Sequence, residues 1–333
     1  MMLKPNPTMP QEICDDLFRL KIPLPESPLK FLNCYVIKGA SRSMIVDTGL
    51  NRTECLSAMR DGLDRIGVDL DRSDFFITHF HEDHFGLVGA LVHKPCKVYF
   101  NCRDLKYIDL LDSLAPMIRS ATRNGCPGKP LRELFAHRTG LGYGNNWRDC
   151  IKAIHDNDVV RVGNYRLRCI HTPGHSMGHT CLYDQQRRIL LSGDHVLGDI
   201  SPNITCWFEG IDPLKAYLQS LDKITPLPVS LVLPGHREPF RDLKPRLTAL
   251  AHHHRSRLHE IMTILENNPW PHTAFDVASK MKWDIDADSW AEFPLLIKFF
   301  ATGEAVAHLR YLVNDGRLCH IDMAPVSTYA IDG

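Results

Sequence analysis

The sequence predicts an α/β layered domain followed by a smaller, mainly helical domain. Short apolar segments rich in β-branched residues alternate with helical segments over residues 11–240. Such alternation is typical of a sheet covered by helices. From about Leu243 the pattern becomes mainly helical. A chain of 333 residues is long enough for one large and one small domain. We therefore expect domains at residues 1–242 and 243–333.

The predicted strands of the large domain are short and are separated by Pro, Gly and Ser. The first four lie at Ile22–Leu24, Leu32–Ile37, Ser43–Gly49 and Phe75–His79. Further strand patterns begin near Lys97, Tyr165, Arg188 and Val229. Between the third and fourth strands, apolar residues at helical spacing predict a helix over Arg52–Ile66.

Two regions depart from this alternation. Residues 103–150 begin with helical spacing and then become rich in Gly and Pro, so we expect an insertion that covers a site. By position, its Tyr107, Met117 and Trp147 are expected at a substrate entrance. The C-terminal region predicts helices over Leu258–Leu265, Ala274–Met281 and Leu295–Val313, and then a strand at Leu318–Asp322. Three helices and a hairpin form a winged-helix pattern.

Charge and composition exclude several functions. The 39 basic and 39 acidic residues balance, which points to neither nucleic acid nor an anionic membrane as a partner. No apolar segment approaches the ~20 residues that span a bilayer, and the N-terminus has no signal-peptide pattern. The 11 cysteines are dispersed without a CxxC pair, as in reduced cytoplasmic proteins. We expect a small-molecule substrate and consider a homodimer plausible.

The segment Thr78–Gly86, THFHEDHFG, carries the strongest chemical signal. Three histidines and an aspartate follow a buried apolar strand. Side chains two apart on an extended segment point the same way, so His79 and His81 can converge on one metal ion. Asp83 and His84 follow the bend and can face a second ion. Imidazole and carboxylate are ligands that zinc accepts.

Three further polar clusters follow apolar strands. They are HTPGHSMGHT at His171–Thr180, LLSGDH at Leu190–His195 and LVLPGH at Leu231–His236. If these strand ends meet at one sheet edge, His175 best completes the first ligand set and His236 the second. Asp194 can then bridge two ions ~3.5–4 Å apart, as in two-metal hydrolases.

The order HxHxDH and then distant His, Asp and His resembles the metallo-β-lactamase superfamily, and the resemblance covers about residues 15–240. It implies a four-layer αββα sandwich with its site at one edge, in which Asp47 of the DTG segment orients the metal-binding loop. The residues from Trp290 onward resemble the winged-helix appendage of a subgroup that contains glyoxalase II-like hydrolases and a single-strand endoribonuclease. The implied metal ligands are His79, His81 and His175 for the first ion, Asp83, His84 and His236 for the second, and Asp194 for both.

The resemblance implies a hydrolase in which two zinc ions activate a water molecule, with Asp83 and Asp194 as catalytic carboxylates. The glyoxalase II-like ligand set favours a thioester or related carboxylic ester as substrate. The alternatives are cleavage of single-stranded RNA or another phosphodiester, and a mononuclear iron dioxygenase acting on persulfides. Iron or manganese is accordingly the alternative to zinc. From Arg241 to Asp322, ten Lys/Arg minus eleven Asp/Glu give a net charge of −1, so this region does not favour nucleic acid.

Other histidines are given supporting roles. His179 and His195 are expected beside the ligands, where they hydrogen-bond to them. A direct catalytic role for His195, which adjoins Asp194, is the alternative. The run His252–His254 lies on a predicted helix, and we expect it on a solvated face because consecutive helical positions point in different directions.

Overall fold

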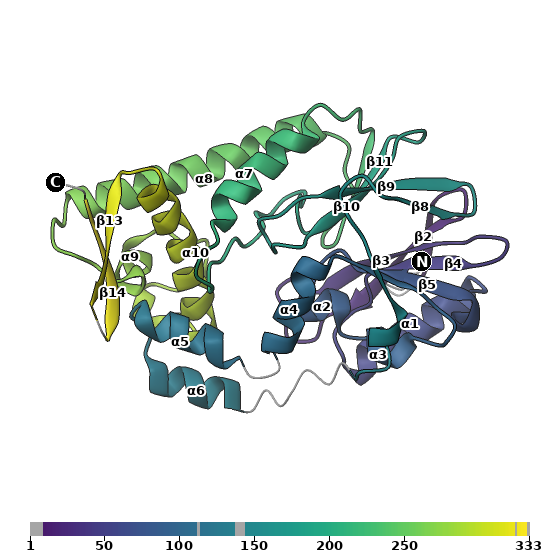
Figure 1. Ribbon diagram of the computed structural model, residues 1–333, viewed down its shortest axis with the longest axis horizontal. Coiled ribbons are helices and arrows are strands. Elements are labelled where there is room, and N and C mark those ends of the chain that lie inside the picture. The colour runs from purple at the N-terminus through teal and green to yellow at the C-terminus, as the bar shows by residue number, and fades with distance from the viewer. Residues whose placement is uncertain (1–8, 112–113, 137–143, 324, 332–333) are drawn as a thin grey trace, which may run out of the picture. The chain divides into compact units, whose positions relative to one another are not determined.

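The structure, a computed structural model, describes residues 9–111, 114–136, 144–323 and 325–331. It divides into two compact units (Figure 1). The first unit comprises residues 1–109, 141–202 and 224–246, and the second comprises residues 110–140, 203–223 and 247–333. The expected insertion, 103–150, is therefore shared between the units. The expected domains, 1–242 and 243–333, stay a prediction about how the chain is organised.

A seven-stranded mixed sheet forms one half of the first unit. Its strands follow chain order: β1 (Gln11–Cys14), β2 (Leu17–Pro23), β3 (Phe31–Ile37), β4 (Ser43–Val46), β5 (Ser73–Phe76), β6 (Val98–Phe100) and β7 (Ile151–Ala153). The strands from β1 to β4 pair antiparallel. From β4 to β7 they pair parallel, because helical segments return the chain to the same end of the sheet.

A five-stranded mixed sheet forms the other half of this unit. Its order is β12 (Leu231–Pro234), β11 (Ile189–Gly193), β10 (Thr180–Asp184), β9 (Tyr165–His171) and β8 (Val159–Val162). The pair of β11 and β12 is parallel, and the remaining pairs are antiparallel. The fold is thus α/β with two mixed sheets, in agreement with the predicted class.

The two sheets share a buried apolar cluster that alternation along the strands creates. On β9, Tyr165, Leu167 and Cys169 are buried in this cluster, whereas Arg166 between them is exposed. The first sheet contributes Tyr35, Val46 and Phe76 among others. A sheet-on-sheet core therefore holds the first unit together.

Helices cover the other face of the seven-stranded sheet. A second buried cluster joins residues of β2, β3 and β5 to Met59 and Leu63 of α1 (Thr53–Arg65) and to Phe85 of α2 (Glu82–Phe85) and Leu91 of α3 (Val88–Leu91). Helix α1 matches the expected Arg52–Ile66 within a residue at each end. Helix, sheet and sheet account for three of the four expected layers, and the fourth stays a prediction.

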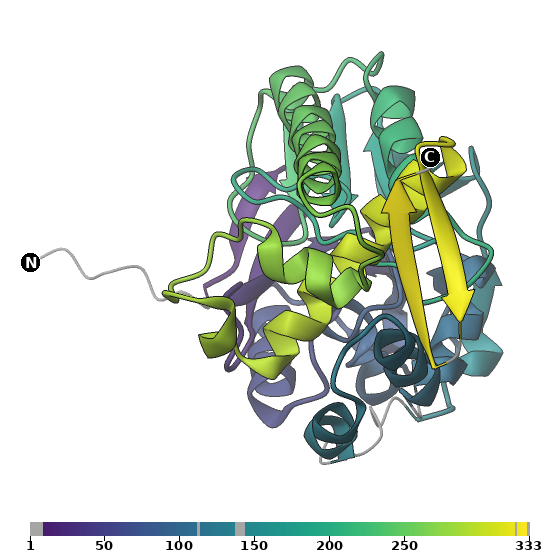
Figure 2. The ribbon, with the colours of Figure 1, turned by 90° about the vertical axis from the view of Figure 1, so that its left-hand side faces the viewer.

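The second unit contains α5, α6, α7, most of α8, α9, α10 and a hairpin. The hairpin strands β13 (Leu318–Met323) and β14 (Val326–Ile331) run side by side in opposite directions (Figure 2). The helices are α5 (Ala115–Arg123), α6 (Gly128–Ala136), α7 (Pro213–Ile224), α8 (Leu243–Glu266), α9 (Ala274–Lys280) and α10 (Leu295–Asn314). The chain crosses between the units within α4 (Cys102–Leu111), after residues 140 and 202, at the end of α7 and within α8.

Two sequence expectations are wrong. Trp147 does not lie at an entrance: it is fully buried in the first unit, with its ring 4.8 Å from that of Phe85. His254 is not on a solvated face: it is fully buried, and its Nδ1 lies 3.1 Å from Nε2 of His308. His252 on the same helix is exposed as expected. The consecutive histidines thus point to different environments.

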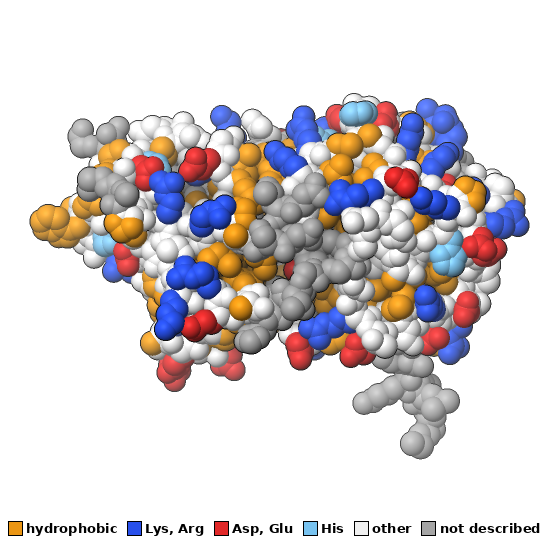
Figure 3. All heavy atoms as spheres, turned by 60° about the horizontal axis from the view of Figure 1, so that its bottom comes forward, with side chains coloured by type: hydrophobic (Ala, Val, Ile, Leu, Met, Phe, Trp, Pro, Cys, Tyr) orange, Lys and Arg blue, Asp and Glu red, His pale blue; other side chains and the backbone are white. Residues whose placement is uncertain are grey.

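The surface agrees with the balanced charge. Lys and Arg side chains are intermixed with Asp and Glu on the face shown in Figure 3. Within the described ranges, each helix is too short or too polar to cross a lipid bilayer.

The sheet-on-sheet core can be tested with Leu167→Ala. Leu167 is fully buried between the sheets, so removal of its side chain should lower the free energy of unfolding by about 2–5 kcal/mol. Chemical denaturation followed by circular dichroism measures the change. The control is Arg166→Ala on the exposed side of the same strand, expected to change stability by no more than about 0.5 kcal/mol. Equal losses in the two variants would contradict a core at this position.

Candidate metal centre

The polar motifs of the sequence meet at one edge of the first unit. His79 and His81 follow β5, and Asp83 and His84 lie within α2. His175 lies in the loop between β9 and β10. Asp194 and His236 follow β11 and β12. The structure brings all seven expected ligand residues together, although five different segments supply them.

The first cluster combines His79, His81 and His175. Their ligand atoms all lie within 4.8 Å of one another. Nε2 of His79 is 3.0 Å from Nδ1 of His81, and the rings of His81 and His175 stand perpendicular with centroids 4.5 Å apart. Three imidazoles that converge from two loops form a set that can hold a divalent cation.

The second cluster combines Asp83, His84 and His236, whose ligand atoms also lie within 4.8 Å of one another. Nε2 of His236 is 3.2 Å from Oδ2 of Asp83. Both histidines are fully buried, whereas the Asp83 side chain is 22% exposed. Asp83 is therefore the member of this cluster that solvent reaches most readily.

Asp194 lies where the two clusters meet. Its Oδ2 is 3.6 Å from Nε2 of His175 in the first cluster and 3.4 Å from Nε2 of His236 in the second. Its Oδ1 is 3.4 Å from Nε2 of His84. One carboxylate thus lies within 3.6 Å of imidazole nitrogens from both clusters.

Buried atoms without hydrogen bonds show that these residues fit metal ions. Among the described residues, Nε2 of His84, Nε2 of His236 and Oδ1 of Asp194 are buried and have no hydrogen-bond partner. Leaving such atoms unsatisfied costs about 1–3 kcal/mol each, and a cation between them removes that cost. The clusters are therefore suited to divalent metal ions.

The ring nitrogens of His84 and His236 that face away from the clusters contact other protein groups. Nδ1 of His84 is 2.8 Å from Oδ2 of Asp47, and Nδ1 of His236 is 3.0 Å from the carbonyl oxygen of Phe31. Asp47 also accepts hydrogen bonds from the backbone N–H and the hydroxyl of Thr78, at 2.8 and 2.9 Å. Such partners fix the orientation of imidazole ligands. Asp47 thus contacts the metal-binding loop as expected.

The histidines of the two clusters differ in their pKa values. Burial and, to a smaller extent, neighbouring His175 lower the pKa of His81 to about 3. Burial is also the largest cause that holds the pKa of His79 well below its usual value. Neutral imidazole is the form that binds metals. In the second cluster, burial alone would lower the pKa of His236, but Asp194 and Asp83 raise it to about 10. The carboxylates there attract positive charge, which a cation would supply.

His179 supports the centre and does not join either cluster. Its Nδ1 is 2.8 Å from the Thr172 hydroxyl, and its Nε2 accepts a hydrogen bond of 3.2 Å from the backbone N–H of Asp194. The expected hydrogen-bonding role is therefore seen for His179. His195 is fully buried with its ring 5.9 Å from that of His179, and it belongs to neither cluster.

Sequence reasoning missed two residues at this edge. Gly235 precedes His236, and a Cβ there would lie 2.8 Å from Cε1 of His84 and would also contact Asp194, so glycine is required by close packing. Asp104 on α4 is fully buried and receives hydrogen bonds from both histidine-bearing loops. The proline-glycine step before His236 was a visible signal for Gly235. Asp104 lies in a segment without other polar clusters, so no motif marks it.

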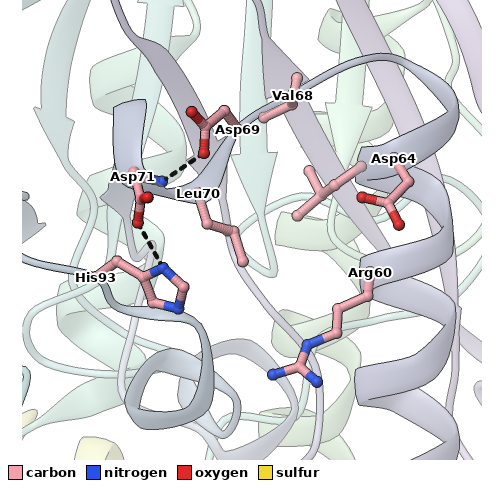
Figure 4. Close-up of a pocket in the computed structure, with 8 residues that line it drawn as sticks. Arg60, Asp64, Val68, Asp69, Leu70, Asp71 and His93 are labelled. Atoms are coloured by element: carbon pink, nitrogen blue, oxygen red, sulfur yellow. Dashed lines mark hydrogen bonds and ion pairs between the residues drawn. The ribbon is translucent and has the colours of Figure 1, made fainter.

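A separate cavity of about 250 Å³ lies beside α1 in the same unit. Three of its polar residues bond to one another: Nδ1 of His93 is 2.8 Å from Asp71, whose backbone N–H donates to Asp69 (Figure 4). None of its lining residues belongs to the clusters that could hold a metal ion among the described residues. This cavity is therefore separate from the candidate metal centre.

Known proteins resemble this chain. It is 24% identical over 284 residues to a probable metallo-hydrolase of Bacillus subtilis, which covers 80% of this chain and 85% of that protein. It is 26% identical over 223 residues to an atrochrysone carboxyl ACP thioesterase of Aspergillus fumigatus, which covers 67% of this chain and 41% of that protein. The chain spans 60% of the length of the lactamase-like protein adaB of Aspergillus niger.

A solved structure resembles the whole fold. A metallo-beta-lactamase family protein from Thermus thermophilus aligns with a TM-score of 0.74 and 26% identity, over 96% of this chain and all of that one. The family described as the metallo-beta-lactamase superfamily matches residues 28–236, which include all seven clustered side chains. The chain belongs to the metallo-beta-lactamase superfamily.

Proposed function

We propose that the protein is a metal-dependent hydrolase that holds two zinc ions and cleaves a thioester or a related carboxylic ester. The observation that carries the proposal is the position of Asp194, whose carboxylate contacts histidines of both clusters. A carboxylate shared in this way is typical of hydrolases with paired metal ions.

Each ion has its own ligand set in this proposal. His79, His81 and His175 would hold the first, and Asp83, His84 and His236 would hold the second. Asp194 would serve both. When bound, the ions supply Lewis acidity that makes water a nucleophile near neutral pH and stabilises negative charge on the substrate oxygen.

The protein's own groups position the reactants. The partly exposed Asp83 carboxylate accepts a hydrogen bond from the attacking water and orients it toward the substrate carbonyl. Asp47 and the Phe31 carbonyl keep Nε2 of His84 and of His236 directed at the site. The Asp194 carboxylate is held in turn through its own backbone N–H, which donates to His179.

The thioester assignment rests on similarity as well as on chemistry. The relative from Aspergillus fumigatus is a thioesterase acting on an ACP-bound substrate by its name, and the imidazole-rich ligand set suits zinc. We propose a small-molecule thioester as the substrate class. For the C-terminal helices and hairpin we propose a winged-helix-like domain that serves in packing. Iron or manganese in place of zinc is the alternative to be tested.

Asp194→Asn should remove most of the activity. The amide keeps the shape of the side chain but has only one acceptor oxygen and no negative charge to offer the two ions. Turnover should therefore fall at least ~100-fold, and the metal content should drop. The measurements are kcat on a thioester panel and metal content by elemental analysis. Full turnover with Asn at this position would contradict the two-metal proposal. The control is Asp71→Asn, in the separate cavity, which should leave kcat unchanged.

Metal removal should abolish hydrolysis reversibly. Protein treated with a chelator should lose activity and regain it on addition of zinc, with about two equivalents bound per chain.

Protein purified without added metal should be assayed with thioesters, phosphodiesters and RNA. One tightly bound iron per chain, with oxygen consumption in the presence of a persulfide, would overturn the hydrolase proposal. Preference for a phosphodiester or RNA would retain the metal centre but replace the substrate class.

A further inference from the structure

Asp104 is a buried carboxylate that neither metal cluster includes. It lies on the first turn of α4 and is completely inaccessible to solvent. It accepts three hydrogen bonds: from the Phe80 backbone N–H at 3.2 Å, from the Ser176 hydroxyl at 2.6 Å and from the Gly178 backbone N–H at 2.5 Å. A carboxylate can accept about four hydrogen bonds, so three donors occupy most of its acceptor positions and define its orientation.

The three donors belong to the two loops that carry the first cluster. Phe80 lies between His79 and His81, and Ser176 directly follows His175. Asp104 is therefore hydrogen-bonded to both sides of the gap that a cation in this cluster would occupy. Gly178 shows how closely the second loop packs on α4, since a Cβ there would lie 2.6 Å from Cγ of Asp104.

The second cluster is held by other groups. Asp47 contacts Nδ1 of His84, and the Phe31 carbonyl contacts Nδ1 of His236. In the described part of the chain, the hydrogen bonds of Asp104 reach none of the residues of that cluster. Asp47 contacts both clusters, since it also accepts a hydrogen bond from the Thr78 hydroxyl, which lies 3.0 Å from Nδ1 of His79. The hydrogen bonds of Asp104, by contrast, go only to the loops of the first cluster.

We propose that Asp104 is a positioning residue that sets the spacing of His79 and His81 from His175 and so tunes metal affinity at the first cluster alone. The proposal rests on the metal centre described under the proposed function. Loss of a group that orients metal ligands typically weakens binding ~10–100-fold. The effect should be confined to the first cluster, because the hydrogen-bond partners of Asp104 all lie in the loops of that cluster.

Asp104→Asn is the informative variant. The amide is nearly the same size but replaces one acceptor oxygen with an NH₂ group, which would face an N–H or O–H donor. At least one of the three hydrogen bonds is then lost, and the two loops are no longer held at one distance. Ser176→Ala removes a single donor and should act in the same direction with a smaller effect.

Zinc affinity can be measured one cluster at a time in the full chain. His236→Ala removes a ligand of the second cluster, so zinc binding in that variant reports on the first. His81→Ala does the reverse. Asp104→Asn should raise the zinc dissociation constant ~10–100-fold in the His236→Ala protein and by less than about threefold in the His81→Ala protein. Competition with a chromophoric zinc chelator provides both values without any substrate.

Asp47→Asn is the matched comparison, because Asp47 contacts His84 directly and His79 through the Thr78 hydroxyl. It should weaken zinc binding in both single-cluster proteins. Equal effects of Asp104→Asn in both proteins, or no effect in either, would overturn the proposal. If Asp104→Asn does not fold, as judged by circular dichroism, Ser176→Ala decides by the same comparison.

The zinc-affinity result for Asp104 does not depend on which reaction the protein catalyses. A protein that binds zinc but cleaves no thioester would refute the proposed substrate and leave the role of Asp104 intact. Absence of zinc binding in both single-cluster proteins would overturn the metal centre and the role of Asp104 together.

Discussion

The structure of the candidate metal centre depends on one buried carboxylate placed among histidines from different loops. Asp194 is 6% exposed and lies within 3.6 Å of His84, His175 and His236. Burial of an anion is unfavourable unless positive charge or hydrogen bonds compensate it. Three imidazoles surround the carboxylate, and the glycine at position 235 leaves room for it. A divalent cation in these clusters would supply such positive charge.

Rigid strands place these loops. Each clustered side chain lies in a loop or short helix that begins within a few residues of a buried strand end, and the strands are fixed by the apolar cluster between the sheets. Loops mounted on such a scaffold can carry polar groups at high precision. The supports behind the ligands, Asp47, Asp104 and the Phe31 carbonyl, also come from the first sheet and from the helix that follows it.

The clustering of these seven residues could be predicted because each occupies a short motif after an apolar strand, and strand ends on one edge converge. The strands themselves and helix α1 followed from local periodicity. The remaining features depend on tertiary packing, so the local sequence pattern could not predict them. Asp104 is marked by no motif, and Trp147 and His254 are buried by segments distant in sequence. Helix α6 was missed because Gly128 and Pro130 suggest a loop, although proline is tolerated in a first helical turn.

The clusters also connect the two sheets. Each takes two residues from the segment after β5 of the first sheet and one from a loop of the second sheet, and Asp194 belongs to the second. A bound ion would therefore act as a cross-link between the halves of the sandwich. Ligands that bind only the folded state stabilise it by about 2.7 kcal/mol at a concentration 100 times the dissociation constant. Resistance to proteolysis would then follow the supply of metal, so that a starved cell would clear this protein while a replete one would accumulate it.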